Sequence, residues 1–334
     1  MSAMTSPDGT GRLMLLDSAS LYFRAYFGVP DQRTDASQPP TNAVRGFLDM
    51  IASLVTTHQP THLVACWDND WRPQWRVDLV PSYKAHRVTE APPAAAAGGA
   101  PDQAHPASDD TVAEEVPDDL APQVPVIVDA LAALGIARLG ADGFEADDVI
   151  GTLATRWGGE MNVDIVTGDR DLLQLVDDAR GVRVLYTGKG GVRDPDLATQ
   201  DYLRERYAVE NGDAYLDMSV LRGDTSDGLP GVKGIGDKTA AQLIAEYGSL
   251  AGLREAVDSG APAIKGARRA NLEAASDYLD VAPTVVRVAR DAPVPEADLA
   301  LPTQVADPVL MSKVASEFGV TSSFNRVLSA LRID

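Results

Sequence analysis

Apolar residues fall along this chain in two patterns, short continuous runs and longer runs with helical spacing. The short runs have the length and apolar content of buried strands, and they cover residues 13–17, 62–68, 162–167 and 182–187. Helical spacing appears in the segments between them, at residues 21–27, 43–57, 122–134 and 145–157. Strands that alternate with helices predict an α/β fold, with a mostly parallel central sheet flanked by helices.

Three of these predicted strands end in an aspartate, namely Asp17, Asp68 and Asp169. Right-handed crossovers would bring the three strand ends to one edge of the sheet, which is where open α/β sheets bind ligands. A single aspartate after a strand is usually a turn or cap residue, and the sequence EADD at 145–148 could simply cap its helix. Acids that converge from several elements favour a site instead.

Nine acids are expected at this edge: Asp17, Asp68, Glu145, Asp147, Asp148, Asp169, Asp171, Asp224 and Asp227. Two carboxylates about 4 Å apart repel by roughly 4 kcal/mol at an effective dielectric of 20, so the cluster needs cations. None of the four histidines falls in these motifs, and all-oxygen ligands favour Mg²⁺ or Mn²⁺ over zinc. Two-metal phosphodiester hydrolysis is the chemistry that such a site indicates.

Cations and aromatic rings are interleaved in residues 69–87. The residues concerned are Arg72, Arg76, Lys84 and Arg87 with Trp71, Trp75 and Tyr83. This mixture suits phosphate contacts with base stacking, although a partly buried amphipathic helix would show the same pattern. On a helix, Lys84 and Arg87 would share one face.

A glycine-rich turn, GVKGIG at 231–236, separates two helical patterns. Such a turn, with Gly234, Gly236 and the nearby Lys238, exposes backbone N–H groups to a phosphate. It is not a P-loop, because Asp237 intervenes before Lys238 and no strand precedes it, which argues against a Mg²⁺-dependent NTPase. The acidic motifs also lack the spacing of an EF-hand.

Composition narrows the remaining possibilities. The 29 Lys+Arg against 49 Asp+Glu give a net charge of −20, which argues against a basic coat for nucleic acid but not against a local basic groove. The single cysteine, Cys66, excludes an internal disulfide. With no signal peptide and no apolar run of membrane-spanning length, a cytoplasmic protein is expected. Residues 88–116 are rich in Pro, Ala, Gly and acid, and disorder is predicted there.

The motifs GFEADDVIGTLA, VTGDRDLLQL and LRGDTSDGLPGVKGIGDKTA, in this order, resemble those of the structure-specific 5′ nuclease family. That family includes flap endonucleases and the 5′–3′ exonuclease domain of bacterial DNA polymerase I. The resemblance runs from about Leu13 to the C-terminus, apart from residues 88–116. It implies a disordered tail at 1–11 and a nuclease core at 12–220 with a helical arch at about 70–118. A helix-hairpin-helix and C-terminal helical region would occupy 221–334.

The resemblance also implies roles for individual residues. One metal group would use Asp17, Asp68, Glu145, Asp147 and Asp148, and the other Asp169, Asp171, Asp224 and Asp227. Lys84 and Arg87 would act near the scissile phosphate, from the arch. DNA contacts would come from Arg24, Arg72, Arg76, Tyr83, Gly234, Gly236 and Lys238. Gly228 stands where many members of the family have Asn, a change expected to be mild.

What the resemblance implies overall is a monomeric 5′-flap endonuclease and 5′–3′ exonuclease, active in DNA repair and Okazaki-fragment processing. K⁺ could bind the hairpin at 231–240. The sequence leaves open whether RNA-containing 5′ ends are cleaved. The alternative from another functional class is a non-catalytic branched-DNA-binding protein that keeps the fold. Retention of all nine acids disfavours this alternative, because their charge repels phosphate.

Overall fold

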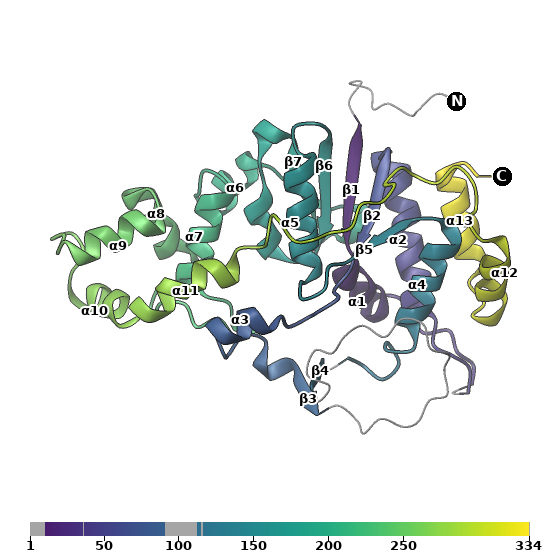
Figure 1. The fold of residues 1–334 in the computed structure, drawn as a ribbon, viewed down its shortest axis with the longest axis horizontal. Coiled ribbons are helices and arrows are strands. Elements are labelled where there is room, and N and C mark those ends of the chain that lie inside the picture. Colours follow the sequence, from purple (N-terminus) through teal and green to yellow (C-terminus); the bar gives the residue numbers. More distant parts are fainter. Residues whose placement is uncertain (1–10, 36, 91–111, 115, 334) are drawn as a thin grey trace.

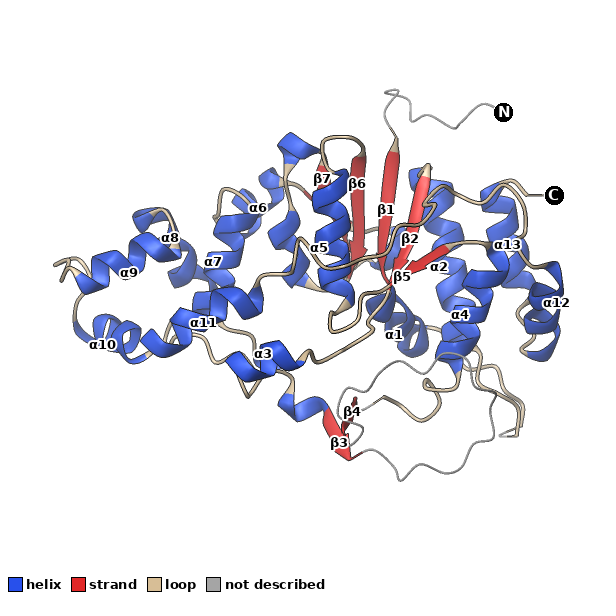
Figure 2. Ribbon diagram, in the orientation of Figure 1, coloured by secondary structure: helices blue, strands red, loops and turns tan. Residues whose placement is uncertain are grey.

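A six-stranded sheet forms the centre of the molecule (Figures 1 and 2). The computed structural model describes residues 11–35, 37–90, 112–114 and 116–333. The strand order is β5-β2-β1-β6-β7-β8, with all neighbours parallel except β8, which runs antiparallel at one edge. The strands are β1 (Arg12–Asp17), β2 (His62–Cys66), β5 (Ala137–Leu139), β6 (Asn162–Thr167), β7 (Val182–Tyr186) and β8 (Asp196–Ala198). The predicted α/β class is confirmed.

Helices cover both faces of this sheet, because its central strands are apolar on both sides. Leu13 and Leu15 of β1 belong to the core on the face covered by α5 (Ala146–Trp157), and Met14 and Leu16 belong to the opposite core. The helices that pack against the second face are α2 (Asn42–His58), α4 (Gln123–Leu134), α12 (Pro308–Glu317) and α13 (Thr321–Leu331). Helix α1 (Ser18–Gly28) follows β1 and packs on α2.

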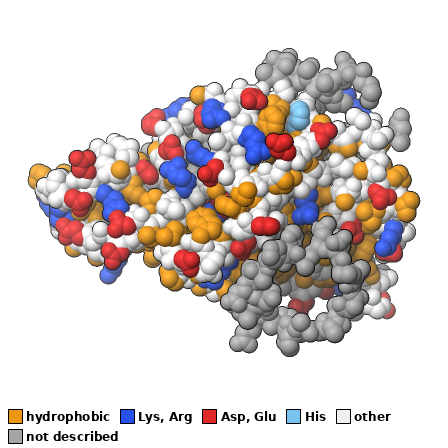
Figure 3. Space-filling view, in the orientation of Figure 1, with side chains coloured by type: hydrophobic (Ala, Val, Ile, Leu, Met, Phe, Trp, Pro, Cys, Tyr) orange, Lys and Arg blue, Asp and Glu red, His pale blue; other side chains and the backbone are white. Residues whose placement is uncertain are grey.

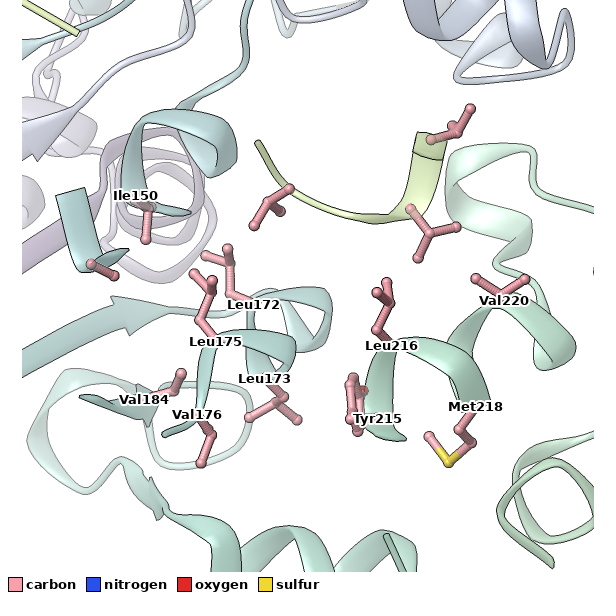
Figure 4. Close-up of a cluster of buried hydrophobic side chains, with 14 of the residues drawn as sticks. Ile150, Leu172, Leu173, Leu175, Val176, Val184, Tyr215, Leu216, Met218 and Val220 are labelled. Atoms are coloured by element: carbon pink, nitrogen blue, oxygen red, sulfur yellow. The ribbon is translucent and has the colours of Figure 1, made fainter. Parts of the chain in front are cut away.

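A helical arm extends from the α5 side of the sheet (Figure 1). Its helices are α6 (Gln200–Tyr207), α7 (Gly212–Arg222), α8 (Asp237–Tyr247), α9 (Leu250–Asp258), α10 (Gly266–Ala274) and α11 (Ser276–Val286). Its core is continuous with that of the sheet, since Tyr215 and Leu216 of α7 share one buried cluster with Leu172 and Leu173 (Figure 4). Short 3₁₀ turns link the strands and helices: η2 (Arg170–Leu175), η3 (Asp178–Arg180), η4 (Gly191–Arg193) and η5 (Thr225–Asp227).

The chain returns from the arm to the sheet after α11. Leu63 at the start of β2 donates its backbone N–H to Leu299, and Leu301 donates to Thr61. Helices α12 and α13 then complete the second face by packing on α4 and α2. Residues 288–307 therefore tie the arm to the core in addition to the direct connection into α7.

The described parts of the segment between β2 and α4 lie beneath the carboxyl ends of the strands (Figure 1). It contains α3 (Gln74–Leu79), the 3₁₀ turn η1 (Ala85–Arg87), and the strands β3 (Val88–Glu90) and β4 (Val112–Glu114), which pair antiparallel. Disorder is predicted over 88–116, and at the two ends of this segment the structure pairs β3 with β4, so that each strand satisfies the other's backbone groups. Residues 91–111 and 115, and the tail at 1–10, lie outside the described residues.

On the face of the molecule shown in Figure 3, acidic and basic side chains are interspersed. Among the helices of the described segments, none has both the length and the apolar character that a bilayer crossing requires.

Candidate active site

A cavity opens at the carboxyl ends of β1 and β6, where the strand order of the sheet reverses direction. From β1 the chain continues to β2 and β5 on one side of β1, whereas β6, β7 and β8 lie on the other side. The edge between the ends of β1 and β6 is therefore a topological switch point, which is the usual position of ligands in open α/β sheets. The cavity has a volume of about 620 Å³. Eight of the nine predicted acids line it: Asp17, Asp68, Glu145, Asp147, Asp169, Asp171, Asp224 and Asp227.

Asp17 stands at the centre of this edge. Its Oδ2 accepts a hydrogen bond of 2.6 Å from the Thr167 hydroxyl, and its Oδ1 accepts one of 3.1 Å from the Ser20 backbone N–H. The same Thr167 oxygen accepts a hydrogen bond from the Asp169 backbone N–H. Burial, reinforced by the neighbouring Asp68 and Asp169, raises the pKa of Asp17 to about 7 despite these hydrogen bonds.

Burial also raises the pKa of four further acids in the cavity, namely Asp68, Asp147, Asp171 and Asp227. For Asp147 and Asp171 the pKa lies well above its ordinary value, with the charge of Asp169 adding to the desolvation. For Asp68 the shift is upward although its carboxylate accepts a hydrogen bond of 2.8 Å from the Ala146 backbone N–H. Removal from water and mutual repulsion therefore push this cluster toward binding cations or protons.

Two basic side chains face the acids from the segment after α3. Lys84 donates a hydrogen bond to Glu145, and Arg87 donates one of 2.7 Å to Asp227. Burial opposes the charged form of Lys84, but Glu145, Tyr83 and Asp227 together outweigh it and raise the pKa of Lys84 well above its ordinary value. The predicted helix through both residues is absent: Lys84 has a left-handed backbone with φ 48° and precedes η1, which holds Arg87. Both side chains nevertheless line the cavity.

Two arginines, Arg170 and Arg222, lie next to Asp224 and Asp171. Arg170 donates a hydrogen bond of 2.6 Å to Asp224. Burial raises the pKa of Asp224, but hydrogen bonds to its carboxylate, this one included, and the charge of Arg170 outweigh burial and lower that pKa. Arg222 forms an ion pair with Asp171 at 3.5 Å. Sequence reasoning missed both arginines, although Arg170 lies inside the motif GDRD and its position between two candidate ligands was a usable signal.

Asp148 differs from the other eight acids, because it lies behind the cavity lining and is fully buried. Both of its oxygens pair with the guanidinium of Arg76, at 2.7 and 2.8 Å. Arg76 is itself only 2% exposed, which places its side chain in the interior rather than on a DNA-facing surface. At Arg76, the aromatic and basic pattern of residues 69–87 therefore corresponds to the alternative interpretation given above, a partly buried segment.

Three other predicted DNA contacts have local partners. The Tyr83 ring is buried and its hydroxyl donates a hydrogen bond of 2.7 Å to Glu145. Arg72 donates to the Tyr83 carbonyl oxygen at 2.7 Å, which fixes the turn before Lys84. Arg24 donates to the Gly188 carbonyl oxygen at 3.4 Å, close to the cavity but outside its lining.

The glycine-rich turn lies in the arm, between α7 and α8. Gly234 has a positive φ of 76°, and Gly236 precedes the first residue of α8. The side chain of Asn271 on α10 donates a hydrogen bond of 2.8 Å to the Lys233 carbonyl oxygen and holds the turn in place. Lys233 and Lys238 are exposed on it. The predicted hairpin between two helices is therefore present, with Gly234, Gly236 and the two lysines exposed.

The turn after α7 also touches the segment that carries Lys84. Gly228 has a positive φ of 69°, and a Cβ built on it would lie 1.9 Å from the Ser82 carbonyl oxygen. The Lys84 backbone N–H donates to the Asp227 carbonyl oxygen at 2.9 Å. The close approach leaves no room for a side chain at position 228 in this chain, and the expectation that the Gly228 difference is mild stays a prediction.

The chemistry of the lining fits divalent cations. Eight carboxylates supply only oxygen donors, as Mg²⁺ and Mn²⁺ require. Asp171 Oδ1 is buried and accepts no hydrogen bond from any residue that the structure describes. Among the same residues, however, no three acids are already gathered closely enough to hold an ion. The ion pairs of Lys84, Arg87 and Arg170 hold several of the carboxylates instead.

Comparison with known proteins agrees with this arrangement. Residues 12–208 match the family described as 5′-3′ exonuclease, N-terminal resolvase-like domain, and residues 211–308 match the 5′-3′ exonuclease, C-terminal SAM fold. A 5′-3′ exonuclease of Streptomyces coelicolor is 56% identical over 318 residues, covering 95% of this chain and 99% of the relative. A 5′-3′ exonuclease of Mycobacterium tuberculosis is 49% identical, covering 96% and 97%.

A solved structure supports the fold independently of sequence. The bacteriophage T5 flap endonuclease, in a pseudo-enzyme-product complex with DNA and metal ions, matches with a TM-score of 0.59 at 16% identity. The match covers 96% of this chain and 99% of that one. Taken with the two family matches and the relatives, the chain belongs to the 5′-3′ exonuclease family of nucleases.

Proposed function

We propose that this chain is a metal-dependent, structure-specific 5′ nuclease that cleaves DNA with free 5′ ends, as a 5′-flap endonuclease and 5′–3′ exonuclease. The observation that carries the proposal is the cavity at the sheet edge, with eight carboxylates on its walls and Lys84 and Arg87 facing them. Carboxylates alone would repel a phosphodiester. Carboxylates neutralised by cations, beside an ammonium and a guanidinium, would bind one.

The proposed cofactor is a pair of Mg²⁺ or Mn²⁺ ions. When bound, such ions supply a water of lowered pKa and stabilise the attacking and leaving oxygens of the phosphate. Asp17, Asp68, Glu145 and Asp147 would hold one ion. Asp169, Asp171, Asp224 and Asp227 would hold the other. The fit rests on the donor set and on Asp171 Oδ1, which accepts no hydrogen bond from the described residues.

Lys84 and Arg87 are proposed as the catalytic cations. Their present partners, Glu145 and Asp227, are themselves in the proposed ligand set. A metal ion that takes over these carboxylates would leave both cations without a counter-charge and next to the scissile phosphate. Their charge is then placed where negative charge develops during hydrolysis.

DNA is the proposed partner. Solved proteins of this fold are described in complexes with DNA, among them the T5 flap endonuclease and the catalytic core of Rad2. In this chain the exposed glycine-rich turn, with Lys233 and Lys238, would hold the duplex backbone through phosphate contacts. We also propose that K⁺ binds the same turn through backbone carbonyl oxygens.

The proposed cellular role is DNA repair and Okazaki-fragment processing, by a monomer in the cytoplasm. The test is incubation of a 5′-labelled flap substrate with the protein in Mg²⁺, in Mn²⁺ and in EDTA, together with a gel-shift measurement of binding. Cleavage near the flap junction with either metal and none in EDTA is expected. Asp171→Asn should abolish cleavage while flap binding persists. Binding without cleavage by the wild-type protein under all conditions would instead support a non-catalytic branched-DNA-binding protein.

A further inference from the structure

The guanidinium of Arg76 connects three separate parts of the molecule, namely α3, the start of α5 and the end of α11. It begins on α3 and donates hydrogen bonds to Glu145, to both oxygens of Asp148, and at 3.1 Å to the Val285 carbonyl oxygen near the end of α11. Its plane also lies over the Trp75 ring, 4.4 Å from the ring centre. Since the side chain is almost completely buried, each of these contacts acts without screening by water.

Asp148 has no capacity left for a metal ion. Its Oδ1 accepts hydrogen bonds from Arg76 at 2.7 Å and from the Ala289 backbone N–H at 2.7 Å. Its Oδ2 accepts from Arg76 at 2.8 Å and from the Glu145 backbone N–H at 3.2 Å. Four donors saturate the carboxylate, and Asp148 is itself outside the cavity lining.

Glu145, in contrast, lines the cavity and is held from behind by the same guanidinium. Its Oε2 accepts hydrogen bonds from Arg76 and Tyr83, and its Oε1 accepts from Lys84. Of these three donors, Lys84 lines the cavity together with Glu145, whereas Arg76 and Tyr83 lie outside the lining. Arg76 and Tyr83 can therefore remain in place when the cavity fills.

We infer that Arg76 and Asp148 form a buried ion pair that positions Glu145 for the metal ion, and that Asp148 is a positioning residue rather than a metal ligand. The inference rests on the proposed metal-dependent function, which it deepens. Arg76 orients Glu145 together with Tyr83, and Tyr83 still holds Glu145 when both members of the pair are replaced. Asp148 balances the charge of Arg76 and fixes its plane through two parallel hydrogen bonds.

The pairing also connects the site to the helical arm. Val285 lies in the last turn of α11 and accepts the hydrogen bond from Arg76. Ala289 follows that helix and donates its backbone N–H to Asp148. One turn away, the buried side chain of Gln174 accepts from the Val288 backbone N–H at 3.1 Å and donates to the Asp171 carbonyl oxygen at 3.0 Å. Through these contacts, residues 285–289 are connected to two turns that line the cavity, the turn that contains Glu145 and the turn that contains Asp171.

A buried ion pair and a direct ligand respond differently to paired substitution. Removing one partner of a buried pair leaves the other charge uncompensated, whereas replacing both by apolar groups is often nearly neutral. A residue that only positions a ligand affects metal affinity by roughly 10- to 100-fold. If Asp148 binds metal itself, removing Arg76 in addition restores nothing.

The experiment is a calorimetric titration of the metal-free, full-length protein with Mn²⁺, without DNA, for Arg76→Met, Asp148→Leu and the double variant. Each single change is expected to weaken Mn²⁺ binding by roughly 10- to 100-fold, and the double variant to recover most of that loss. A double variant that binds Mn²⁺ no better than Asp148→Leu would overturn the inference. Asp147→Leu, at a lining residue, is the matched control and should show no recovery when combined with Arg76→Met.

Folding and the proposed function are tested separately in the same series. If a single variant fails to fold by circular dichroism, the double variant alone decides: near wild-type Mn²⁺ affinity supports the pair, and a loss beyond 100-fold contradicts it. Wild-type protein that binds no Mn²⁺ would refute the metal-dependent function itself. Wild-type binding without recovery in the double variant would refute only the role assigned to Asp148.

Discussion

Thr167 and Asp17 meet across the junction of β1 and β6, where the Thr167 hydroxyl donates a hydrogen bond of 2.6 Å to the Asp17 carboxylate. The two residues are the last of their strands, and both are buried. The bond joins the two halves of the sheet at the point where the acids converge. It also orients the one carboxylate that lies at the centre of the strand edge.

Replacing Thr167 by Val removes this hydroxyl and keeps the shape of the side chain. A lost hydrogen bond to a buried carboxylate lowers the free energy of unfolding by about 1–3 kcal/mol. Cleavage of a flap substrate should also slow, because Asp17 loses its orientation. Thr167→Ser keeps the hydroxyl and is the matched control. Thermal unfolding and initial rates measure both effects, and equal behaviour of the two variants would show that the bond is unimportant.

The raised pKa of Asp17 predicts a pH-dependent stability of the metal-free protein. The folded-state pKa of about 7 exceeds the ordinary 3.8, so the folded form binds the proton more tightly. The contribution is therefore fully present below about pH 4 and is lost as the pH rises through 7. The melting temperature in EDTA should fall between pH 5 and 8. Asp17→Asn should flatten this slope, and Mn²⁺ should restore stability at pH 8 by neutralising the cluster. A melting temperature that rises over this interval would contradict the shift.

The sequence predicted the central architecture because its strands are continuous apolar runs with acids at their ends. The predicted strand at 162–167 matches β6, and the helices at 43–57 and 122–134 match α2 and α4 within one residue. Two short strands of the central sheet were missed. Both β5 and β8 have three residues, too few to show an alternation, and they form because a neighbouring strand offers its free edge.

The candidate site was predictable as a set of acids but not in its inner arrangement. The strand ends explain why Asp17 and Asp169 converge, since a parallel sheet brings its carboxyl ends together. Nothing in the spacing of EADD distinguishes Asp147, which lines the cavity, from Asp148, which faces the interior. That distinction depends on Arg76, which is distant in sequence. From the sequence, an arginine between tryptophans is interpreted as a surface cation, because its burial cannot be seen there.

Gly228 provides a test of the contact between the η5 turn and the segment carrying Lys84. Gly228→Ala should cost about 1 kcal/mol for the left-handed backbone and about 1–3 kcal/mol more for the collision with Ser82. Gly319→Ala is the matched control, because Gly319 has a similar φ of 62° and open space around it. Chemical denaturation of both variants gives the difference, which measures the close approach. Equal losses would mean that the segment yields without cost.

Lys84 and Lys238 should differ in which step of the reaction they affect. Lys84 lines the cavity beside Glu145, so Lys84→Ala should lower kcat by roughly 100-fold and change the Kd for flap DNA little. Lys238 is exposed on the glycine-rich turn, so Lys238→Ala should weaken DNA binding, reduce its salt dependence by about one phosphate contact, and leave kcat unchanged. Single-turnover rates at saturating enzyme and binding isotherms at several salt concentrations separate the two. A binding defect in Lys84→Ala with an unchanged single-turnover rate would remove Lys84 from the reacting phosphate. In that case the Lys84 ammonium would serve only to attract DNA to the acidic cavity.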